Sequence, residues 1–316
     1  MTRAGSRVAA VLLAALFALA AAEAGLRIAR FEYHLYPTVQ FGWPDPVTIE
    51  DFYRSDPDLL WVTRDFGDKV AAARHTHPAI IFLGDSCTEF GTYPTRTIAA
   101  LQQHAPTFAT GVAFGIGGWS SEQGLTLLRR DVVALKPRVV TIYYGWNDHW
   151  VALGPTDPEL TFAHRFQWAA DHVRLVQLLL KARMGVAGPM ANRPNRVPIV
   201  RYRANLRAMV REAHTAGIHA VLITAPSNHV AGHEPEYLKL RHLRTLGELV
   251  PLHQAYVEVT REVARESGAT LCDAAAAFEQ LEGRNRYFQK DGIHLTMQGD
   301  EQLAGLLASC IVHAAE

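Results

Sequence analysis

Short apolar runs that end in glycine, aspartate or asparagine alternate with longer amphipathic stretches over most of the chain after Pro78. This alternation is typical of the strand and helix units of a parallel sheet. Five of the runs are candidate buried strands, at residues 79–83, 107–113, 139–144, 220–224 and 269–272. The pattern therefore predicts an open five-stranded sheet that begins near residue 79.

Amphipathic stretches between these runs predict helices. One covers residues 122–135, after the cap signal of Ser120 and Ser121, and another covers residues 298–312. A third presents one apolar helical face, made of Leu206, Met209, Val210 and Ala213. Helices that alternate with buried strands cover both faces of a sheet, so we expect three layers.

Two segments depart from this pattern. Residues 31–78 are rich in aromatic residues, proline and aspartate without a long helical period, which predicts an irregular or short-stranded N-terminal extension. Residues 150–198 combine a helix-like stretch, 162–183, with a run rich in glycine, proline and asparagine. We interpret this second segment as an insertion over the edge of the sheet, within a main domain at residues 79–316.

The first 30 residues have the charged-then-apolar order of an export signal. Arg3 and Arg7 precede an apolar run over residues 8–22, and small residues at 20–22 and 22–24 offer cleavage sites. Continuation to Ile28 gives a length that reaches that of a membrane-spanning helix. We expect export to the periplasm or cell envelope, with residues 1–30 as a signal peptide or as an anchor that associates with the membrane through residues 8–28.

Composition narrows the class of protein. The chain has 316 residues, of which 49% are hydrophobic and 20% charged, so a large buried core is expected. Lys and Arg number 31, as do Asp and Glu, and this neutral balance argues against a nucleic-acid partner. Three distant cysteines, Cys87, Cys272 and Cys310, form neither a disulfide framework nor a Cys-x-x-Cys metal site.

Four polar or glycine-rich blocks follow predicted strands or precede the last helix. They are Gly84-Asp85-Ser86, Gly115-Ile116-Gly117-Gly118, Gly145-Trp146-Asn147-Asp148 and Asp291-Gly292-Ile293-His294. Ligands of open parallel sheets bind beyond the carboxyl ends of the strands. These blocks are therefore the candidate site.

Taken together and in this order, the four blocks resemble the signature blocks of the SGNH/GDSL hydrolase superfamily. The resemblance covers residue 79 to the C-terminus, and it implies a three-layer α/β/α sandwich with a five-stranded parallel, flavodoxin-like sheet. Two positions depart from the common pattern, with Ala113 where asparagine often precedes the glycine block and Leu295 where proline often follows the histidine. Neither departure removes a catalytic atom.

The resemblance implies a role for each matching residue. Ser86 is the expected nucleophile, His294 the base that takes its proton, and Asp291 the carboxylate that orients the imidazole. The expected oxyanion donors are the backbone N–H of Ser86, the backbone N–H of Gly118 and the side-chain amide of Asn147. No cofactor and no metal ion is expected.

Competing interpretations of single motifs are weaker. Gly115-x-Gly117 hints at a dinucleotide-binding loop, but the third glycine would fall at Ser120. His229 and His233 have i, i+4 spacing, yet without further ligands they are better interpreted as surface or loop histidines.

Other residues beside the blocks are given structural roles. Asp85 is expected to hold its loop by hydrogen bonds, and Cys87 to be a packing residue rather than a second nucleophile. For Trp119, Trp146 and Trp150, lining of a substrate cleft and packing in the core both remain open.

The resulting functional hypothesis is a serine hydrolase that cleaves an ester through an acyl-enzyme. The ester is an acyl ester or an O-acetyl group, carried by a small molecule or a carbohydrate. One alternative is an acyl or acetyl transferase that acts on an envelope polysaccharide. The other is a non-catalytic envelope module that binds carbohydrate or serves assembly.

Overall fold

The computed structural model describes residues 3–33, 52–164, 167–185, 190–240 and 242–314. Residues 34–51, which make up much of the predicted N-terminal extension, lie outside the described residues.

Five parallel strands form the central sheet, in the order β4-β3-β5-β6-β7. Their bounds are β3 Ile80–Gly84, β4 Gly111–Gly115, β5 Val139–Tyr143, β6 His219–Ile223 and β7 Thr270–Cys272. Numbered along the chain, this order is 2-1-3-4-5, the flavodoxin-like order. The predicted α/β fold with a five-stranded parallel sheet is confirmed.

Four of the predicted strands lie within one residue of the observed ends, and the second is displaced. The sequence predicted residues 107–113, whereas the strand is Gly111–Gly115, preceded by the 3-10 turn η1 Pro106–Phe108. Proline has no N–H to donate to a strand partner, which explains why the chain turns here before it pairs.

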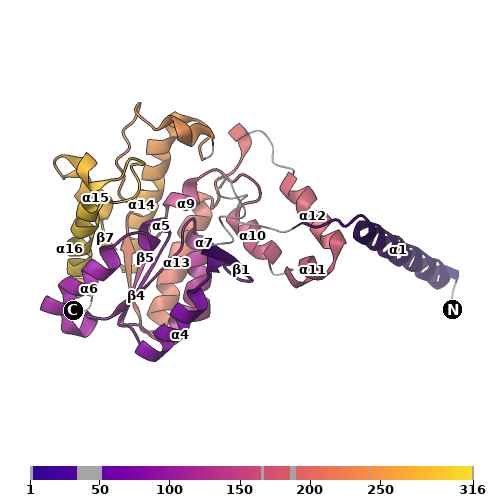
Figure 1. The fold of residues 1–316 in the computed structure, drawn as a ribbon, viewed down its shortest axis with the longest axis horizontal. Helices are drawn as coiled ribbons and strands as arrows, with labels where there is room; N and C mark the ends of the chain where they lie inside the picture. Colours follow the sequence, from indigo (N-terminus) through magenta and orange to yellow (C-terminus); the bar gives the residue numbers. More distant parts are fainter. Residues whose placement is uncertain (1–2, 34–51, 165–166, 186–189, 241, 315–316) are drawn as a thin grey trace.

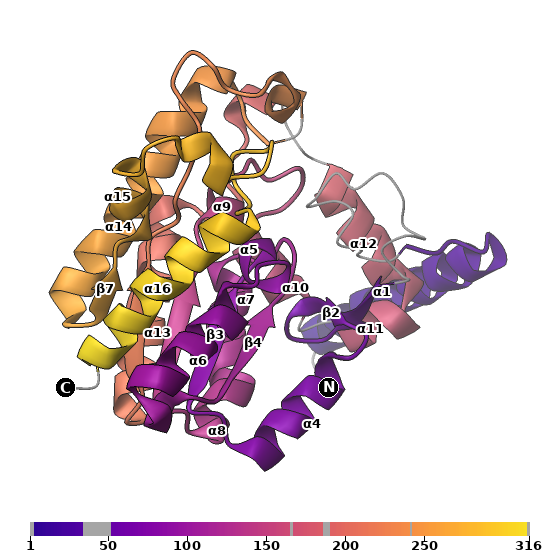
Figure 2. The same cartoon turned by 60° about the vertical axis from the view of Figure 1, so that its left-hand side comes forward.

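Helices cover both faces of the sheet, and the alternation of side chains along each strand decides which residues meet which helices. Ile81, Leu83, Val140 and Ile142 pack in one core with helices α7, α13 and α14, whereas Ile80, Phe82 and Val139 pack in the other core with α6, α15 and α16. Figure 2 shows α6 and α16 lying across the near face of the sheet. The helix bounds are α6 Tyr93–His104, α7 Ser121–Leu127, α13 Ile199–Thr215, α14 Leu249–Ser267, α15 Ala274–Glu279 and α16 Met297–Ala314.

The helix predicted over residues 122–135 begins as expected and then changes its winding. Ser120 caps α7, and the Gln123 side-chain oxygen accepts a hydrogen bond from the Ser120 N–H at 2.9 Å, which completes a capping box. A π turn, Leu128–Val132, and a last turn, α8 Val133–Leu135, follow. The predicted apolar face of α13 is buried in full.

The N-terminal extension contains a helix that the sequence analysis did not predict. A hairpin of β1 Tyr53–Asp56 and β2 Leu60–Thr63 precedes α4 Phe66–Thr76. Only Phe66, Val70 and Ala73 of α4 are buried, so its apolar stripe is too thin to stand out in the sequence. The hairpin and α4 pack into the main core, which therefore reaches back to Tyr53.

In its described residues, the segment predicted as an insertion holds three α-helices in place of one long helical stretch. They are α10 Asp157–His164, α11 Gln167–His172 and α12 Arg174–Gly185. A bridge between Val151 and Asn195 closes the base of the segment. The remaining short turns are α5 Ser86–Glu89, α9 Trp146–His149, η3 Met190–Asn192, η4 Glu236–Leu240, η5 Leu246–Glu248 and η6 Arg284–Tyr287.

Helix α1, Arg3–Ile28, projects away from the α/β body (Figure 1). Its residues 7–28 have a mean hydropathy of 2.2, and the helix is long and apolar enough to cross a membrane. Near its C-terminal end, the Glu23 carboxylate accepts hydrogen bonds from the N–H groups of Arg174 and Leu175 at 3.0 and 2.9 Å. These properties fit a signal sequence or an anchor.

Candidate active site

The carboxyl ends of β3, β4 and β5 bring three of the four sequence blocks to one edge of the sheet. Ser86 is the first residue of α5, directly after β3, and Asp85 caps this turn by accepting a hydrogen bond from the Cys87 N–H at 2.9 Å. The fourth block, Asp291 to His294, lies in the loop between η6 and α16. The fold thus gathers residues that are far apart in the sequence.

Ser86, His294 and Asp291 form a continuous hydrogen-bonded chain. The His294 Nε2 atom lies 2.9 Å from the Ser86 Oγ atom, and the His294 Nδ1 atom lies 2.6 Å from the Asp291 Oδ2 atom. In this arrangement the imidazole can take a proton from the hydroxyl while the carboxylate fixes its tautomer. The structure therefore brings together the three residues expected to act on the acyl group.

The Asp291 loop is built to aim its carboxylate. The Asp291 Oδ1 atom accepts hydrogen bonds from the N–H groups of Ile293 and His294, which leaves Oδ2 for the imidazole. Gly292 has a φ of +72°, and a Cβ atom there would lie 2.8 Å from the Nε2 atom of His229. Only glycine fits this turn without strain.

His229 is a contact that the sequence analysis missed. Its Nε2 atom lies 2.8 Å from the carbonyl oxygen of Asp291, so the ring contacts the backbone of the loop that carries Asp291 and His294. The sequence interpretation placed it with His233 as a surface or loop histidine. His233 is exposed, whereas His229 is half-buried in the site.

Burial and charge act in opposite directions on the His294–Asp291 pair. Burial alone lowers the pKa of His294, but the hydrogen bond and the charge of Asp291 outweigh it and raise that pKa above the ordinary histidine value. For Asp291, burial raises the pKa, and hydrogen bonds from His294 and the loop amides turn the net shift downward. The pair is thus adapted to hold a proton on the imidazole once it arrives.

The pH profile of ester hydrolysis should report this histidine. A protonated His294 cannot accept the Ser86 proton, so kcat/KM should rise with pH through a midpoint above the ordinary histidine pKa of about 6.5. Initial rates of p-nitrophenyl acetate hydrolysis across pH 5 to 9 measure it. His229→Gln is the control, since burial lowers the pKa of His229. Burial raises the pKa of Asp85 to about 6, which is still below the midpoint expected for His294. A midpoint below 6.5, or one that moves with His229, would contradict the assignment.

Two backbone donors face the same space as the Ser86 hydroxyl. Within the described part of the chain, neither the N–H of Ser86 nor that of Gly118 donates a hydrogen bond to another residue, and both residues line one cavity. Gly118 has a φ of +77°, a left-handed conformation that a residue with a Cβ atom rarely adopts. Both N–H groups are therefore available to a developing oxyanion.

Asn147, the third expected donor, lies in α9 and lines the cavity, but its amide is already engaged. The Nδ2 atom donates to the Trp119 carbonyl oxygen at 3.0 Å and to the Asp85 Oδ2 atom at 3.2 Å. A side-chain amide has only two N–H bonds. Both of these N–H bonds are used in the structure, and the bond to Asp85 is the longer.

Removal of this amide should slow the chemistry more than it weakens binding. We expect Asn147→Ala to lower kcat by about 10²- to 10³-fold, the usual loss for one oxyanion donor, with a much smaller change in KM. Steady-state kinetics with p-nitrophenyl acetate measures both. Asn192→Ala, at an exposed position in η3, is the matched control. A loss below about fivefold would mean that Asn147 only braces Asp85 and Trp119.

A cavity of about 300 Å³ opens onto Ser86. Trp146 and Trp150 stack in its wall with ring centroids 5.8 Å apart, whereas Trp119 is fully buried. All three tryptophans are buried and pack in a core, and Trp146 and Trp150 also line the cavity. Its lining residues are Ser86, Phe90, Gly117, Gly118, Trp146, Asn147, Trp150, Tyr237, Leu238, His242, Asp291, Ile293 and His294.

A pair of neutral histidines supports the Trp146 side of the cavity. The His253 ring stacks on Trp146 at 3.9 Å between centroids, and its Nδ1 atom lies 3.2 Å from the Nε2 atom of His149. Burial lowers the pKa of His253 to about 4 and lowers that of His149 as well. Both rings therefore stay uncharged and pack behind Trp146 in the wall of the cavity.

Cys87 is buried next to the nucleophile. Burial raises the pKa of its thiol well above the ordinary value. A thiol kept protonated is a poor nucleophile, which agrees with the packing role expected for it.

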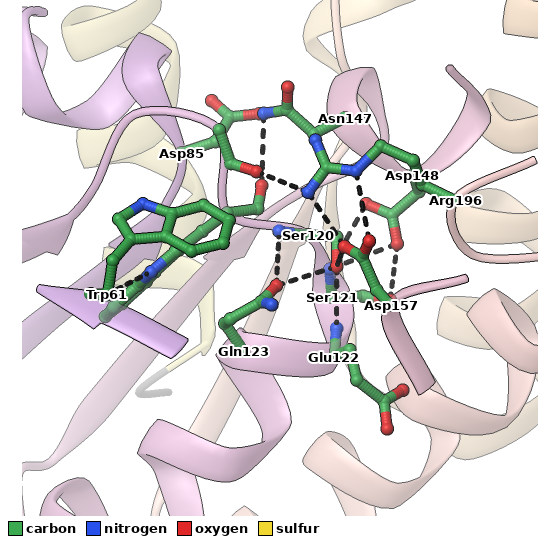
Figure 3. A network of polar contacts seen from close by, with 12 residues as sticks. Trp61, Asp85, Ser120, Ser121, Glu122, Gln123, Asn147, Asp148, Asp157 and Arg196 are labelled. Carbon is green, nitrogen blue, oxygen red and sulfur yellow. Dashed lines mark hydrogen bonds and ion pairs between the residues drawn. The ribbon is translucent and has the colours of Figure 1, made fainter. Parts of the chain in front are cut away.

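The glycine loop of the second block is held by side chains that the sequence analysis did not single out as site residues (Figure 3). Trp61 donates to the carbonyl oxygen of Gly117, Arg196 donates to that of Gly118, and Glu89 accepts from the Gly117 N–H. No sequence signal marks Arg196, because an arginine in a run of proline and asparagine resembles an exposed loop residue. Trp61 stood out only as one of several aromatic residues in the extension.

Among the described residues, no three His, Cys, Asp or Glu side chains cluster closely enough to hold a metal ion. The interpretation of His229 and His233 as a metal pair therefore gains no third ligand there. The expectation that the chain needs no metal or cofactor stays a prediction.

The family described as "GDSL-like Lipase/Acylhydrolase family" matches residues 82–302. A GDSL-like lipase from Bacteroides thetaiotaomicron has a similar structure, with a TM-score of 0.50, 18% identity, and coverage of 79% of this chain and 97% of that one. A search of curated proteins finds no match.

Two further solved structures show a lower structural similarity. A lipase/acylhydrolase from Enterococcus faecalis has a TM-score of 0.48 and 19% identity, over 73% of this chain and 94% of that one. An acetylxylan esterase from Geobacillus stearothermophilus has a TM-score of 0.45 and 19% identity, over 74% of this chain and 92% of that one.

Proposed function

Because the chain belongs to the GDSL-like lipase/acylhydrolase family, the SGNH hydrolases, we propose that it hydrolyses an ester through an acyl-enzyme formed on Ser86. One observation carries this proposal, the unbroken hydrogen-bonded chain from the Ser86 hydroxyl through His294 to Asp291 at the mouth of a cavity. A hydroxyl is a weak nucleophile until a base removes its proton, and this chain supplies the base.

The first half of the reaction forms the acyl-enzyme. His294 Nε2 takes the proton of Ser86 Oγ as that oxygen attacks the ester carbonyl carbon, and the carbonyl oxygen becomes an oxyanion. The N–H groups of Ser86 and Gly118, together with the Asn147 amide, donate hydrogen bonds to this oxyanion and stabilise its charge. The imidazolium then protonates the departing alcohol oxygen, and the C–O bond of the ester breaks.

The second half releases the acid. Water gives a proton to His294 and attacks the acyl carbon, and the same donors stabilise the second oxyanion. The proton returns to Ser86 Oγ as the carboxylic acid leaves, so the enzyme regains its starting state. Throughout, Asp291 keeps the imidazole in the tautomer whose Nε2 atom faces the serine.

The substrate we propose is a small acyl ester, such as an O-acetyl group on a carbohydrate. A cavity of about 300 Å³ admits a short acyl chain more readily than a long one. Trp150 and Tyr237 in its wall offer apolar surface for the alcohol part, while His242 offers a polar contact.

The test uses the full chain in detergent with p-nitrophenyl esters of increasing acyl length, followed by an acetylated oligosaccharide. We expect fastest turnover of the shortest esters and release of free acetate from the sugar. A folded protein that hydrolyses none of them would reject the hydrolase proposal. Product analysis with an added sugar acceptor separates the alternative, because acylated acceptor instead of free acid would indicate a transferase.

We also propose that α1 is retained as an anchor with the α/β body outside the cytoplasm. The helix continues past both candidate cleavage sites to Ile28, and Glu23 makes hydrogen bonds to the start of α12. Mass spectrometry of the mature protein tests it. An N-terminus at residue 23 or 25 would show that a signal peptide had been removed.

A further inference from the structure

The carbonyl groups of Gly117 and Gly118 accept hydrogen bonds from two buried side chains that lie outside the central sheet. The Trp61 Nε1 atom donates to the Gly117 carbonyl oxygen at 3.1 Å, and the Arg196 Nη2 atom donates to the Gly118 carbonyl oxygen at 2.8 Å. In Figure 3, Trp61 lies on the left of the polar network and Arg196 on the right. Two consecutive peptides are thus fixed by two separate donors.

Peptide geometry turns these contacts into a statement about the oxyanion site. The Gly117 carbonyl and the Gly118 N–H belong to one planar trans peptide, so they point in opposite directions. Trp61, which holds the Gly117 carbonyl, therefore also sets the direction of the Gly118 N–H. Arg196 holds the next peptide, which contains the Gly118 carbonyl and the Trp119 N–H, and so restrains Gly118 from its other side. Glycine has the widest choice of backbone conformations, so this peptide needs such a restraint more than most.

Trp61 is itself held in place. It is 2% exposed, and its own carbonyl oxygen accepts a hydrogen bond at 3.0 Å from the Nε1 atom of Trp119, the residue that follows Gly118. The two indoles therefore tie the hairpin strand β2 to the glycine loop in both directions. The Trp119 bond reaches only the backbone of Trp61, whereas the Trp61 indole that donates to Gly117 is fixed by its burial. A donor fixed this way loses little further freedom when the transition state forms.

Arg196 is fixed by a buried ion pair. Its Nε and Nη2 atoms contact the two carboxylate oxygens of Asp157 at 3.1 and 2.8 Å, and both side chains are at most 1% exposed. Asp157 also accepts from the Ser120 hydroxyl at 2.7 Å, beside the start of α7. Burying two charges is costly, so the pair is weak evidence for added stability, and what it does show is an arginine held in one position.

We propose that Trp61 and Arg196 are positioning residues that aim the N–H of Gly118 at the oxyanion. The inference rests on the proposed function, since it concerns the same acyl transfer on Ser86. It assigns a part in the reaction to the N-terminal hairpin, because Trp61 precedes the segment, residues 82–302, that matches the family. It also assigns a part in the reaction to the segment that precedes α13, because Arg196 lies in that segment.

The test compares Trp61→Phe with Trp119→Phe. Each variant removes one buried indole N–H···O=C bond from the same pair, but only the first frees the Gly117 carbonyl. We expect Trp61→Phe to lower kcat by about 10- to 100-fold with KM nearly unchanged, less than the loss on removing an oxyanion donor outright. Trp119→Phe should lower kcat by less than about threefold, and melting temperatures should fall alike in both variants.

Arg196→Lys provides the second variant. It keeps the charge beside Asp157, but a single ammonium replaces a fork that serves the carboxylate and the Gly118 carbonyl together. We expect the same signature, a fall in kcat with KM nearly unchanged. If Trp61→Phe fails to fold, this variant alone decides, and an unchanged kcat in it overturns the proposal.

A readout independent of the natural ester uses a fluorophosphonate, whose phosphoryl oxygen occupies the oxyanion position when Ser86 is labelled. The second-order labelling rate should fall in Trp61→Phe and Arg196→Lys, and hold in Trp119→Phe. Equal losses in Trp61→Phe and Trp119→Phe would overturn the positioning role while leaving the hydrolase proposal intact. An unaltered chain that is folded and is neither labelled nor active would reject both.

Discussion

Ser86→Ala is expected to lower kcat for ester hydrolysis by about 10⁵- to 10⁶-fold, the loss typical of removing the nucleophile of a serine triad. The Ser86 Oγ atom lies 2.9 Å from His294 Nε2, and alanine removes this hydroxyl. The donors of the oxyanion site stay in place, so a small residual rate above that of water should persist. Initial rates with p-nitrophenyl acetate measure the effect.

The matched control is Ser309→Ala, which removes an exposed hydroxyl from α16. It should leave kcat unchanged, and both variants should unfold at nearly the temperature of the unaltered chain, because Ser86 contributes little apolar packing. Retention of more than about one hundredth of the activity in Ser86→Ala would contradict the assignment of the nucleophile. Loss of that residual activity on blocking Cys87 would then identify the thiol as its source.

Asp291→Asn is expected to lower kcat by about 10⁴-fold. The amide can donate where the carboxylate only accepts, so it favours the imidazole tautomer whose proton sits on Nε2, facing Ser86. The remaining carbonyl oxygen can still accept from the N–H groups of Ile293 and His294, which keeps the loop intact. The loss should therefore appear in kcat with little change in melting temperature.

The same variant should move the pH profile. The charge and the hydrogen bond of Asp291 raise the pKa of His294, so their removal should shift the acid-side midpoint of kcat/KM to lower pH. Asp68→Asn, on the exposed side of α4, is the control for loss of one carboxylate charge. A fall of only a few-fold, with an unmoved midpoint, would show that Asp291 neither orients nor charges the imidazole.

Strand positions and site positions could be predicted because each has a local signal. Buried parallel strands are short apolar runs, and the positions that follow them, such as Ser86 and Asn147, carry polar residues that no core would otherwise place there. His294 and Asp291 are three residues apart, so a single turn could be expected to join them. No single block identifies the site, whereas the four blocks in this order resemble the signature of one hydrolase superfamily.

The supports of the site could not be predicted, because their signal lies in tertiary contacts. Arg196 acts through Asp157 and Gly118, neither of which is near it in sequence. Trp61 acts through one carbonyl group, which every residue possesses. Helix α4 escaped for a related reason, since a short helix that buries three side chains leaves almost no periodicity.

The separation of the nucleophile from its base along the chain has a consequence for biogenesis. Ser86 and His294 are 208 residues apart, and the carboxylate of Asp300 in α16 holds the N–H and hydroxyl of Thr92 at the start of α6. Helix α16 must therefore pack beside α6 on the sheet before the Ser86 hydroxyl meets the His294 imidazole. Such distant contacts form late, because the intervening loop must close first. A nascent chain that is still emerging, or one that crosses a membrane unfolded, carries no working triad, and its esterase activity switches on only where folding is completed.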